Sequence, residues 1–411
     1  MLLARFLEPA IVTGALAIVD GAGRTHRFGR GEPRVTLRFH DKAVQRELLM
    51  KPRIAFGEAY MDGRISVEGG SIYDALVVLC QDADVVGPFG RLREALGKAV
   101  RAIQQHNPMQ RAQRNVAHHY DLSRQLYELF LDRDMQYSCA YFARPGMSLE
   151  EAQEAKKCHI AAKLLLEPGQ RVLDIGCGWG GMALYLAQTC GVEVTGITLS
   201  KEQLAVAQER AERAGLADRV RFELRDYRAM TGHDMSGRFD RIVSVGMFEH
   251  VGVPHYPEFF ARVHALLAHD GVALLHSIGR SDGPGTTNGW IRKYIFPGGY
   301  SPALSEVLPR IEEARLWATD VEILRLHYAE TLRHWRQRFT ARREEARRLY
   351  DERFCRMWEF YLAGCEIAFR FQGHMVFQVQ MAKRADAVPL TRDYIGTAEH
   401  ALAAAPTGIA A

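Results

Sequence analysis

Arg171–Ser200 read RVLDIGCGWGGMALYLAQTCGVEVTGITLS, and this stretch decides the fold. Its apolar and β-branched runs predict strands over 171–176 and 192–200, with a helix over 180–190 between them. The first strand leads into the run Gly176-Cys177-Gly178-Trp179-Gly180-Gly181. Glycine is needed where the backbone takes a positive φ or lies against a ligand with no Cβ in between. The stretch therefore predicts a strand, turn, helix and strand with a ligand on the glycine-rich turn.

The spacing of the glycines and the acidic residue before them indicate which class of ligand binds at the turn. The turn reads G-x-G-x-G-G, whereas the G-x-G-x-x-G spacing is typical of turns that place a pyrophosphate at a helix N-terminus. Asp174 stands just before the turn, and its negative field favours a cationic ligand. S-adenosylmethionine carries a sulfonium and an ammonium group, so we expect it to be the cofactor.

The composition is typical of a soluble enzyme with a large core. The chain has 411 residues, of which 47% are hydrophobic and 25% charged, a length that suits two domains. Its seven cysteines are scattered and form no C-x-x-C pair, which favours a reducing compartment without structural disulfides or a metal site. The uncharged run Pro9–Val19 is far shorter than a bilayer span. We expect a cytoplasmic protein without a signal peptide or transmembrane helix.

Changes in composition along the chain indicate its domains. Residues 1–90 mix strand-like pieces (Ala15–Val19, Val35–Phe39) with helix-like ones, and Gly57–Gly63 is interpreted as a turn-rich connection. Residues 91–116 are polar and basic and predict a linker. A cofactor domain is expected over 117–395, with a tail over 396–411. The stretch 279–309 is rich in glycine and proline, which predicts a lid or acceptor-site insertion.

Alternating patterns predict an α/β fold for the cofactor domain. Further helices are expected over 148–166 and 201–214 and for about fifteen residues from Tyr256, and further strands over 220–226, 240–246 and 272–278. Strands and helices in turn indicate a parallel sheet covered on both faces, with the ligand crevice at the carboxyl ends of the strands. The side chains that we expect at this edge are Cys139, Glu249, His250, His276 and Tyr328, the last of them ending a strand-like stretch over Thr319–His327.

Several motifs together resemble the cyclopropane-fatty-acyl-phospholipid synthases, a family that includes the mycolic acid cyclopropane synthases. The motifs are HYDLS at 119–123, YSCAYF at 137–142, VLDIGCGWGG at 172–181, TLS at 198–200, VSVGMFEHVG at 243–252, LHSIG at 275–279 and YLAGC at 361–365. The resemblance covers most of the chain. It implies a Rossmann-like class I S-adenosylmethionine-dependent methyltransferase with a smaller N-terminal mixed α/β domain.

The resemblance also implies a reaction. The π electrons of a cis double bond in a phospholipid acyl chain attack the sulfonium methyl, and loss of a proton from the carbocation closes a cyclopropane ring. The base in this family is a bound bicarbonate ion. The positions that match its cage are Cys139, Glu249, His276, Tyr328, Cys365 and the backbone of Ile278. His276 and Tyr328 can donate hydrogen bonds to an oxyanion, and Glu249 can accept one from the bicarbonate hydroxyl.

The positions that match the cofactor site of the family lie around the glycine-rich turn and after the next two strands. Tyr137 and Ser138 are expected to close over the methionine end, and Thr198 and Gln203 replace the acidic residue that many methyltransferases use for the ribose. Asp226 and Tyr227 are expected beside the adenine. The implied cofactor-binding residues are Tyr137, Ser138, Asp174, Gly176, Cys177, Gly178, Thr198, Leu199, Ser200, Gln203, Asp226 and Tyr227.

A lipid substrate implies peripheral association with the inner face of the cell membrane. Arg333–Arg353 hold eight arginines against four acidic residues and, with Arg91, Arg93 and Lys98, can meet anionic headgroups or form a solvated helix face. The family implies a homodimer that forms through the N-terminal domain.

Three alternatives stay open. The carbocation can be discharged differently, which would give a methylated or methylene fatty acyl chain. A methyltransferase acting on nucleic acid or on a small molecule is disfavoured, because no Asn-Pro-Pro-Tyr type motif is present; we expect no nucleic-acid partner. A catalytically silent lipid-binding protein is disfavoured by the presence of every cage position.

Overall fold

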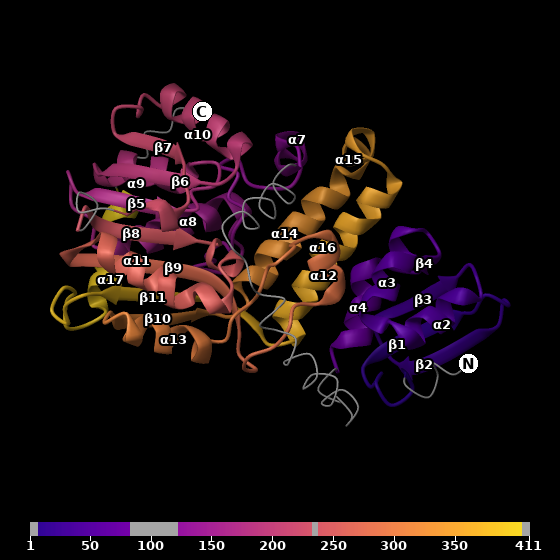
Figure 1. The fold of residues 1–411 in the computed structure, drawn as a ribbon. Coiled ribbons are helices and arrows are strands. Elements are labelled where there is room, and N and C mark those ends of the chain that lie inside the picture. The colour runs from indigo at the N-terminus through magenta and orange to yellow at the C-terminus, as the bar shows by residue number, and fades with distance from the viewer. Residues whose placement is uncertain (1–6, 83–121, 232–236, 405–411) are drawn as a thin grey trace.

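The computed structural model describes residues 7–82, 122–231 and 237–404, which form two packed units (Figure 1). The first unit is a four-stranded sheet with the order β2-β1-β3-β4. β1 pairs antiparallel with β2 and parallel with β3, and β3 pairs antiparallel with β4. Its elements are β1 (Gly14–Val19), β2 (Thr25–Arg30), β3 (Arg34–Phe39), α2 (Ala43–Met50), α3 (Pro52–Met61), β4 (Ile65–Glu68) and α4 (Ile72–Cys80). The two strands expected here and the mixed α/β character are confirmed.

The second unit is built on a seven-stranded sheet with the order β10-β11-β9-β8-β5-β6-β7. Six strands run in one direction, and β11 is antiparallel to both of its neighbours. The order reverses between β5 and β8, which opens the crevice where ligands of such sheets bind. The strands are β5 (Arg171–Ile175), β6 (Glu193–Thr198), β7 (Val220–Leu224), β8 (Phe239–Val245), β9 (Leu267–Arg280), β10 (Trp317–Leu324) and β11 (His374–Ala382).

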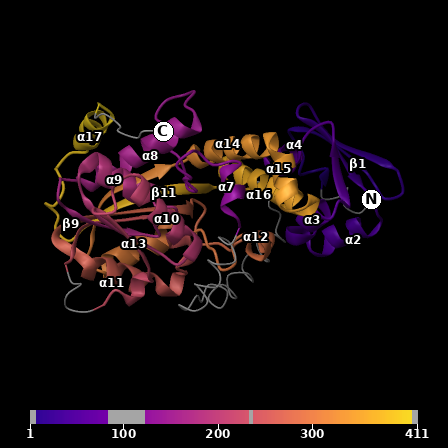
Figure 2. The ribbon, with the colours of Figure 1, turned by 90° about the horizontal axis from the view of Figure 1, so that it is seen from above.

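Helices cover both faces of this sheet (Figure 2). One face packs on α8 (Leu149–Leu164), α9 (Gly181–Cys190) and α10 (Lys201–Arg213), with α17 (Asp393–Ala404) lying on α8. The other face packs on α11 (Tyr256–Leu266) and α13 (Leu304–Glu313). Each predicted helix and strand of the cofactor domain is found within a few residues of its expected place.

Three further helices connect the sheet to the first unit (Figure 1). α14 (His327–Ala341), α15 (Arg343–Leu349) and α16 (Glu352–Phe371) share an aromatic core with α7 (Arg124–Glu128) and its flanking residues, in which Phe130, Trp335 and Trp358 are fully buried. α16 packs against α3 and α4 of the first unit. None of the described helices combines the length and the apolar character needed to cross a bilayer.

The structure corrects several details of the sequence interpretation. Gly57–Gly63 is mostly helical, since α3 continues to Met61, and Tyr328 lies in the first turn of α14 instead of at a strand end. The stretch 279–309 contains the short helix α12 (Gly289–Tyr294) and the start of α13, and the expected boundary at 395 falls inside α17. The expected linker 91–116 and the HYDLS motif up to Asp121 lie outside the described residues.

Gly57 sits in the middle of α3 because a side chain has no room there. A Cβ at this position would lie 2.5 Å from Trp290 Nε1 of α12 and 2.8 Å from Phe360 Cε1 of α16. The absence of a Cβ therefore allows α3 to approach the second unit closely, which explains a glycine in a helix interior.

We expect Gly57→Ala to lower the free energy of unfolding by about 1–3 kcal/mol, because Trp290 and Phe360 must move. Gly396→Ala in α17 is the matched control, since its Cβ would meet no atom within 4 Å and a glycine in a helix interior is unfavourable by about 0.5–1 kcal/mol. Denaturant unfolding of both variants checks this. Equal stability of Gly57→Ala and the wild type would contradict the close packing.

Candidate active site

The glycine-rich turn after β5 is shaped by packing and by positive φ angles. Gly176 has a φ of +86°, and a Cβ there would lie 2.6 Å from Met247 Cβ in the loop after β8. Gly180 has a φ of +85° and packs against Phe222, while Gly178 has a φ of +53° and faces open space. The turn therefore brings the loop after β8 against the end of β5 and leaves its own backbone open to a ligand.

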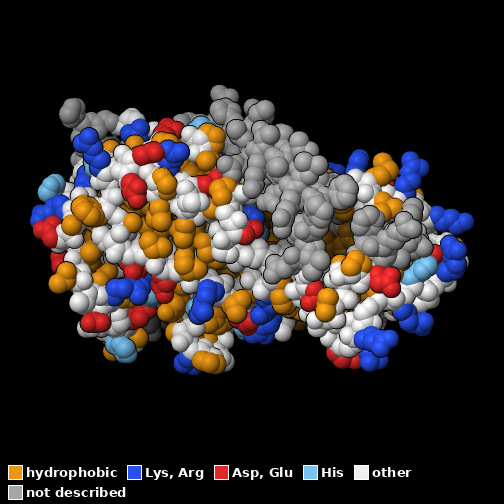
Figure 3. Space-filling model, turned by 90° about the horizontal axis from the view of Figure 1, so that it is seen from below, with side chains coloured by type: hydrophobic (Ala, Val, Ile, Leu, Met, Phe, Trp, Pro, Cys, Tyr) orange, Lys and Arg blue, Asp and Glu red, His pale blue; other side chains and the backbone are white. Residues whose placement is uncertain are grey.

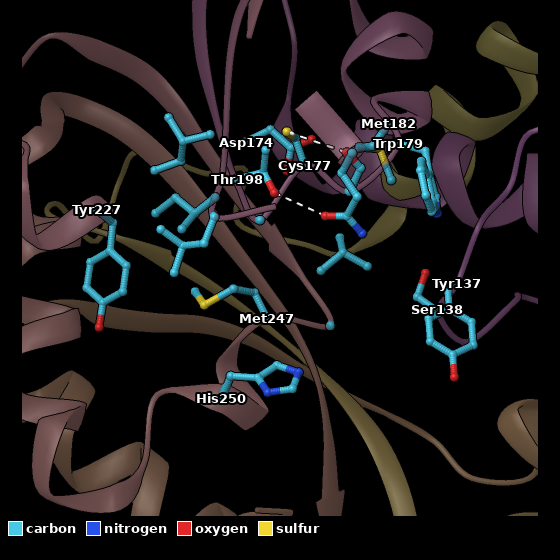
Figure 4. A pocket seen from close by; sticks show the side chains of 18 of the residues that line it. Tyr137, Ser138, Asp174, Cys177, Trp179, Met182, Thr198, Tyr227, Met247 and His250 are labelled. Carbon is cyan, nitrogen blue, oxygen red and sulfur yellow. Dashed lines mark hydrogen bonds between the residues drawn. The ribbon is translucent and has the colours of Figure 1, made fainter. Parts of the chain in front are cut away.

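A cavity with an open volume of about 1140 Å³ lies at this turn (Figure 4). Tyr227 lies at one end and Tyr137 and Ser138 at the other, with Asp174 and Thr198 on one wall and Met247 and His250 on the opposite side. The predicted cofactor residues that line it are Tyr137, Ser138, Asp174, Gly176, Cys177, Gly178, Thr198, Leu199, Gln203, Asp226 and Tyr227. We name this space the cofactor pocket.

Ser200 is the one predicted cofactor residue that does not line the cofactor pocket. Its Oγ accepts a hydrogen bond from the backbone N–H of Gln203 and caps the N-terminus of α10. A serine at this position is explained by the unpaired N–H groups of the first helical turn. Ser200 therefore supports the pocket through α10.

Asp174 suits a cationic ligand. Its carboxyl is buried, and its Oδ2 has no hydrogen-bond partner within the described part of the chain. Burial raises the pKa of Asp174 to about 7, and the positive charge of Lys156 only partly opposes this. A cation in the pocket would favour the ionised form and bring the pKa down again.

Polar contacts hold the other pocket walls in place. Thr198 Oγ1 donates to Gln203 Oε1 at 3.0 Å, which orients the side-chain amide of Gln203. Arg228 donates to Asp226 at 2.7 and 2.9 Å and fixes the carboxylate. The hydroxyl groups of Tyr137 and Tyr361 form a hydrogen bond at 2.8 Å, and the Tyr137 ring stacks on Trp335.

A second cavity, with an open volume of about 670 Å³, adjoins the cofactor pocket, and we name it the acceptor pocket. Tyr137, Ser138, Gly246 and His250 line both cavities. Five of the six predicted cage positions line the acceptor pocket, namely Cys139, Glu249, His276, Ile278 and Tyr328. They come from the loop after α7, the turn Phe248–His250, β9 and α14, so the fold gathers them from distant parts of the chain.

Cys365 is not among the residues that line the acceptor pocket. It lies on α16, partly buried, and packs against the aromatic core. Burial raises the pKa of its thiol to about 12. The structure therefore places Cys365 against the aromatic core and outside the lining of the acceptor pocket.

Glu249 is anchored by one carboxyl oxygen. Its Oε1 accepts a hydrogen bond from the backbone N–H of Ile278 at 2.6 Å, whereas the described residues provide no partner for the buried Oε2. Burial raises the pKa of Glu249 to about 7. A carboxyl with this pKa can exchange a proton or accept a hydrogen bond near neutral pH.

Burial favours the uncharged forms of the two histidines and the cysteine that line the acceptor pocket. Burial lowers the pKa of His276 to about 3 and that of His250 to about 4, so both imidazoles are neutral. Burial also raises the pKa of the Cys139 thiol well above its usual value. The pocket combines neutral hydrogen-bond donors with one carboxyl group.

Sequence analysis missed Lys156 of α8. Its Nζ is fully buried and donates to Gln136 Oε1 at 2.5 Å and to Ser138 Oγ at 2.8 Å. Burial lowers its pKa to about 8. Ala152, Lys156, Ile160 and Lys163 recur at helical spacing on the buried face of α8, and this pattern of cations among apolar residues was the available signal.

The Mycolic acid cyclopropane synthetase family model matches residues 107–379, and a Domain of unknown function (DUF7884) matches residues 15–86. A probable fatty acid methyltransferase of Pseudomonas putida is 36% identical over 350 residues, which are 82% of this chain and 84% of that protein. The cyclopropane-fatty-acyl-phospholipid synthase of Escherichia coli K12 is 44% identical over 265 residues, 64% of this chain and 66% of that protein.

Solved structures agree with these relatives. The mycolic acid cyclopropane synthase CmaA1, in complex with SAH and CTAB, is 35% identical, covers 67% of this chain and 98% of its own, and has a TM-score of 0.62. The cyclopropane synthase MmaA2 from Mycobacterium tuberculosis is 36% identical, covers 68% of this chain and 99% of its own, and has the same TM-score of 0.62. The fold and the resemblance predicted from the motifs are confirmed. The chain belongs to the mycolic acid cyclopropane synthetase family, and it is an S-adenosylmethionine-dependent methyltransferase of the cyclopropane-fatty-acyl-phospholipid synthase class.

Proposed function

We propose that the protein transfers the methyl carbon of S-adenosylmethionine to the cis double bond of an unsaturated phospholipid acyl chain and closes a cyclopropane ring, with bound bicarbonate as the base. The observation that carries this proposal is the pair of adjoining cavities. The cofactor pocket and the acceptor pocket share Tyr137, Ser138, Gly246 and His250, so a methyl donor bound in one would lie next to an acceptor bound in the other.

The walls of the acceptor pocket support an apolar acceptor. Ile278, Ile291, Phe296 and Val376 contribute hydrocarbon surface, and Tyr328 is held by Trp335 and Phe369 at ring distances of 5.8 and 4.8 Å. An alkene needs no deprotonation before it attacks the methyl group, so a strong base at the point of transfer is unnecessary. Aromatic ring faces such as that of Tyr328 favour a nearby positive charge.

The cage residues fit a small oxyanion that carries one hydroxyl. Glu249 Oε2 is buried without a partner in the described chain and can accept from that hydroxyl, while His276 and Tyr328 can donate to its oxygens. Bicarbonate bound there would supply a base for the proton that leaves the newly added methyl group. Glu249 and His276 would hold the ion in reach of that proton.

Electrons and protons are conserved in the proposed methyl transfer and ring closure. The π pair of the alkene forms the new C–C bond as the S–CH₃ bond breaks, which leaves S-adenosylhomocysteine and a carbocation. Loss of one proton from the new methyl group supplies the electron pair for the second C–C bond of the ring. Asp174, at the cofactor pocket, balances the positive charge of the donor before transfer.

A fatty acyl methyltransferase that retains an unsaturation or adds a methyl branch is the second candidate. It is supported by relatives that align over most of both chains, including the Tuberculostearic acid methyltransferase UfaA1 of Mycobacterium tuberculosis, which is 36% identical over 83% of this chain and 82% of its own. Both candidates share the methyl transfer step, and they differ in how the carbocation loses its charge.

Access to lipid requires contact with a membrane surface, which we propose for the N-terminal unit. Seven of the eight arginines within 333–353 form ion pairs with acidic side chains, so this stretch is largely neutralised. Lys and Arg side chains gather at the outer end of the N-terminal unit (Figure 3). The described residues there include the exposed Arg27, Arg30, Lys42 and Arg46, which suit anionic headgroups at the inner face of the cell membrane.

The family resemblance implies a dimer. We propose a homodimer formed through the N-terminal unit. Arg91, Arg93 and Lys98, which are also predicted to contact headgroups, lie outside the described residues.

The first test is the product. Purified protein is incubated with S-adenosylmethionine, bicarbonate and vesicles of cis-monounsaturated phospholipid, and the fatty acid methyl esters are analysed by gas chromatography and mass spectrometry. We expect a chain that is one CH₂ heavier and has lost its double bond to a ring. A heavier chain that keeps an unsaturation would select the second candidate, and an unchanged lipid would overturn both.

We expect Glu249→Gln to lower kcat by about 10²–10³-fold, because a neutral amide accepts a weaker hydrogen bond from the bicarbonate hydroxyl than a carboxylate does. The dissociation constant for S-adenosylmethionine should stay close to the wild-type value, since Glu249 lines only the acceptor pocket. Glu313→Gln on the surface of α13 is the matched control. Equal turnover of Glu249→Gln and the wild type would remove Glu249 from the mechanism.

The pH dependence should report the same carboxyl. The pKa of Glu249 is raised to about 7 and its ionised form is the acceptor, so kcat/KM for lipid should rise as the pH increases from 6 to 8. S-adenosylmethionine is kept saturating so that Asp174 stays ionised, and the bicarbonate ion concentration is held constant. The rise should disappear in Glu249→Gln, and a rise that persists in this variant would assign it to another group.

A further inference from the structure

His276 and Gln378 form a buried pair across two strands. The two residues stand directly opposite each other where β9 and β11 run antiparallel. Their exposed fractions are 2% and 0%. Gln378 Nε2 lies 3.2 Å from His276 Nδ1, so the amide engages the ring nitrogen on the β11 side.

The direction of this hydrogen bond determines where the imidazole carries its proton. An amide nitrogen has two hydrogens and no lone pair for accepting, so it donates, and His276 Nδ1 must accept. A neutral imidazole that accepts at Nδ1 carries its hydrogen on Nε2. With the amide turned over, both of its N–H groups would lack an acceptor among the described residues, whereas in the present orientation one N–H donates to His276 Nδ1 and the carbonyl Oε1 lacks a partner there. In folded proteins, buried N–H groups without an acceptor are rarer than buried carbonyl groups without a donor.

We propose that Gln378 is a positioning residue that fixes the Nε2–H tautomer of His276, so that the acceptor pocket receives a neutral hydrogen-bond donor from β9. The use of this donor to hold bicarbonate rests on the proposed function. Gln378 itself does not line the pocket and acts only through His276.

The surroundings of His276 support the neutral form. Lys156, His159 and Lys163 of α8 place positive charge near the ring, and Glu322 of β10 is the acidic group that opposes them. Burial has the largest effect and keeps the pKa of His276 low. Protonation of His276 at Nδ1 would also direct an N–H group at the N–H of the Gln378 side-chain amide. The hydrogen bond between the two residues would then be lost.

A neutral donor has a chemical advantage at this position. Methyl transfer to an alkene leaves a positive charge on the acyl chain, and an imidazolium in the same low-dielectric pocket would repel it. The Nε2–H group of a neutral imidazole can bind an oxyanion without adding that repulsion. A supporting hydrogen bond from behind the ring is a known way to fix the tautomer and orientation of a ligating histidine.

Nitrogen NMR of the full-length protein with ¹⁵N-labelled histidine tests the assignment directly. The His276 signals are identified by their loss in His276→Asn. We expect the wild-type ring to show Nε2 protonated and Nδ1 unprotonated, without titration between pH 6 and 9. A wild-type signal with Nδ1 protonated would overturn the proposal whatever the variants do.

Gln378→Met removes the donor at nearly constant volume. We expect the tautomers of His276 to mix in this variant and the apparent KM for bicarbonate to rise about tenfold or more, with the dissociation constant for S-adenosylmethionine unchanged. Gln380→Met is the matched control, because Gln380 lies on the same strand but donates to Lys163 O and to the Tyr394 hydroxyl. It should leave the tautomer of His276 as it is.

The two readouts separate the positioning role from the proposed base. An Nε2–H tautomer that survives in Gln378→Met would overturn the role of Gln378. A tautomer that shifts as expected, in an enzyme whose activity does not respond to bicarbonate, would support the role of Gln378 and overturn the bicarbonate assignment. A structural role alone would lower stability in both methionine variants and leave the His276 signals unchanged.

Discussion

The packing of Met247 against Gly176 is the constraint on which the site depends. Because Gly176 has no Cβ, the loop after β8 lies against the turn after β5, with the Met247 side chain in the place that a Cβ would occupy. The same loop carries Glu249 and His250 within three residues of Met247. One close approach therefore sets the cofactor pocket and the acceptor pocket side by side, and the methyl donor and the acceptor meet across shared walls.

The side chains that line the two pockets suit positively charged groups. S-adenosylmethionine carries a positive charge, and the proposed transfer leaves a positive charge on the acyl chain. The two pockets are lined by carboxyl groups and neutral hydrogen-bond donors. Asp174 and Glu249 both have a pKa raised to about 7 by burial, so each is poised to ionise when a positive charge or a proton-donating ligand arrives. The buried ammonium of Lys156 lies behind Ser138, where its hydrogen bonds to Gln136 and Ser138 hold the loop that lines both pockets.

The sequence predicted those parts of the molecule whose signals are local. The glycine-rich turn, the alternating strands and helices, and the cage motifs each stand in a few consecutive residues. The turn, the strands and the helices of the cofactor domain lie close to their expected places, and the predicted site residues other than Ser200 and Cys365 line the two pockets. Errors arose where distant residues decide the conformation. The sequence predicts a turn at Gly57, yet this glycine lies inside α3, where Trp290, more than two hundred residues away, leaves no room for a side chain. Tyr328 follows a strand closely enough to look like its end, but the aromatic core draws it into α14. For the arginines of α14 and α15, the sequence is consistent with a solvated helix face. Ion-pair partners that lie on other elements cannot be identified from the sequence.

The buried thiols have a consequence for the durability of the enzyme. Cys139 lines the acceptor pocket, Cys177 lines the cofactor pocket and Cys365 packs against the aromatic core, and burial raises the pKa of each thiol. Oxidants and alkylating agents attack the thiolate, so a thiol that stays protonated reacts slowly. If the protein acts on unsaturated acyl chains as proposed, it also meets the peroxides that such chains form. The desolvation that shapes the pockets thereby protects their sulfur atoms from the chemistry of damaged lipid.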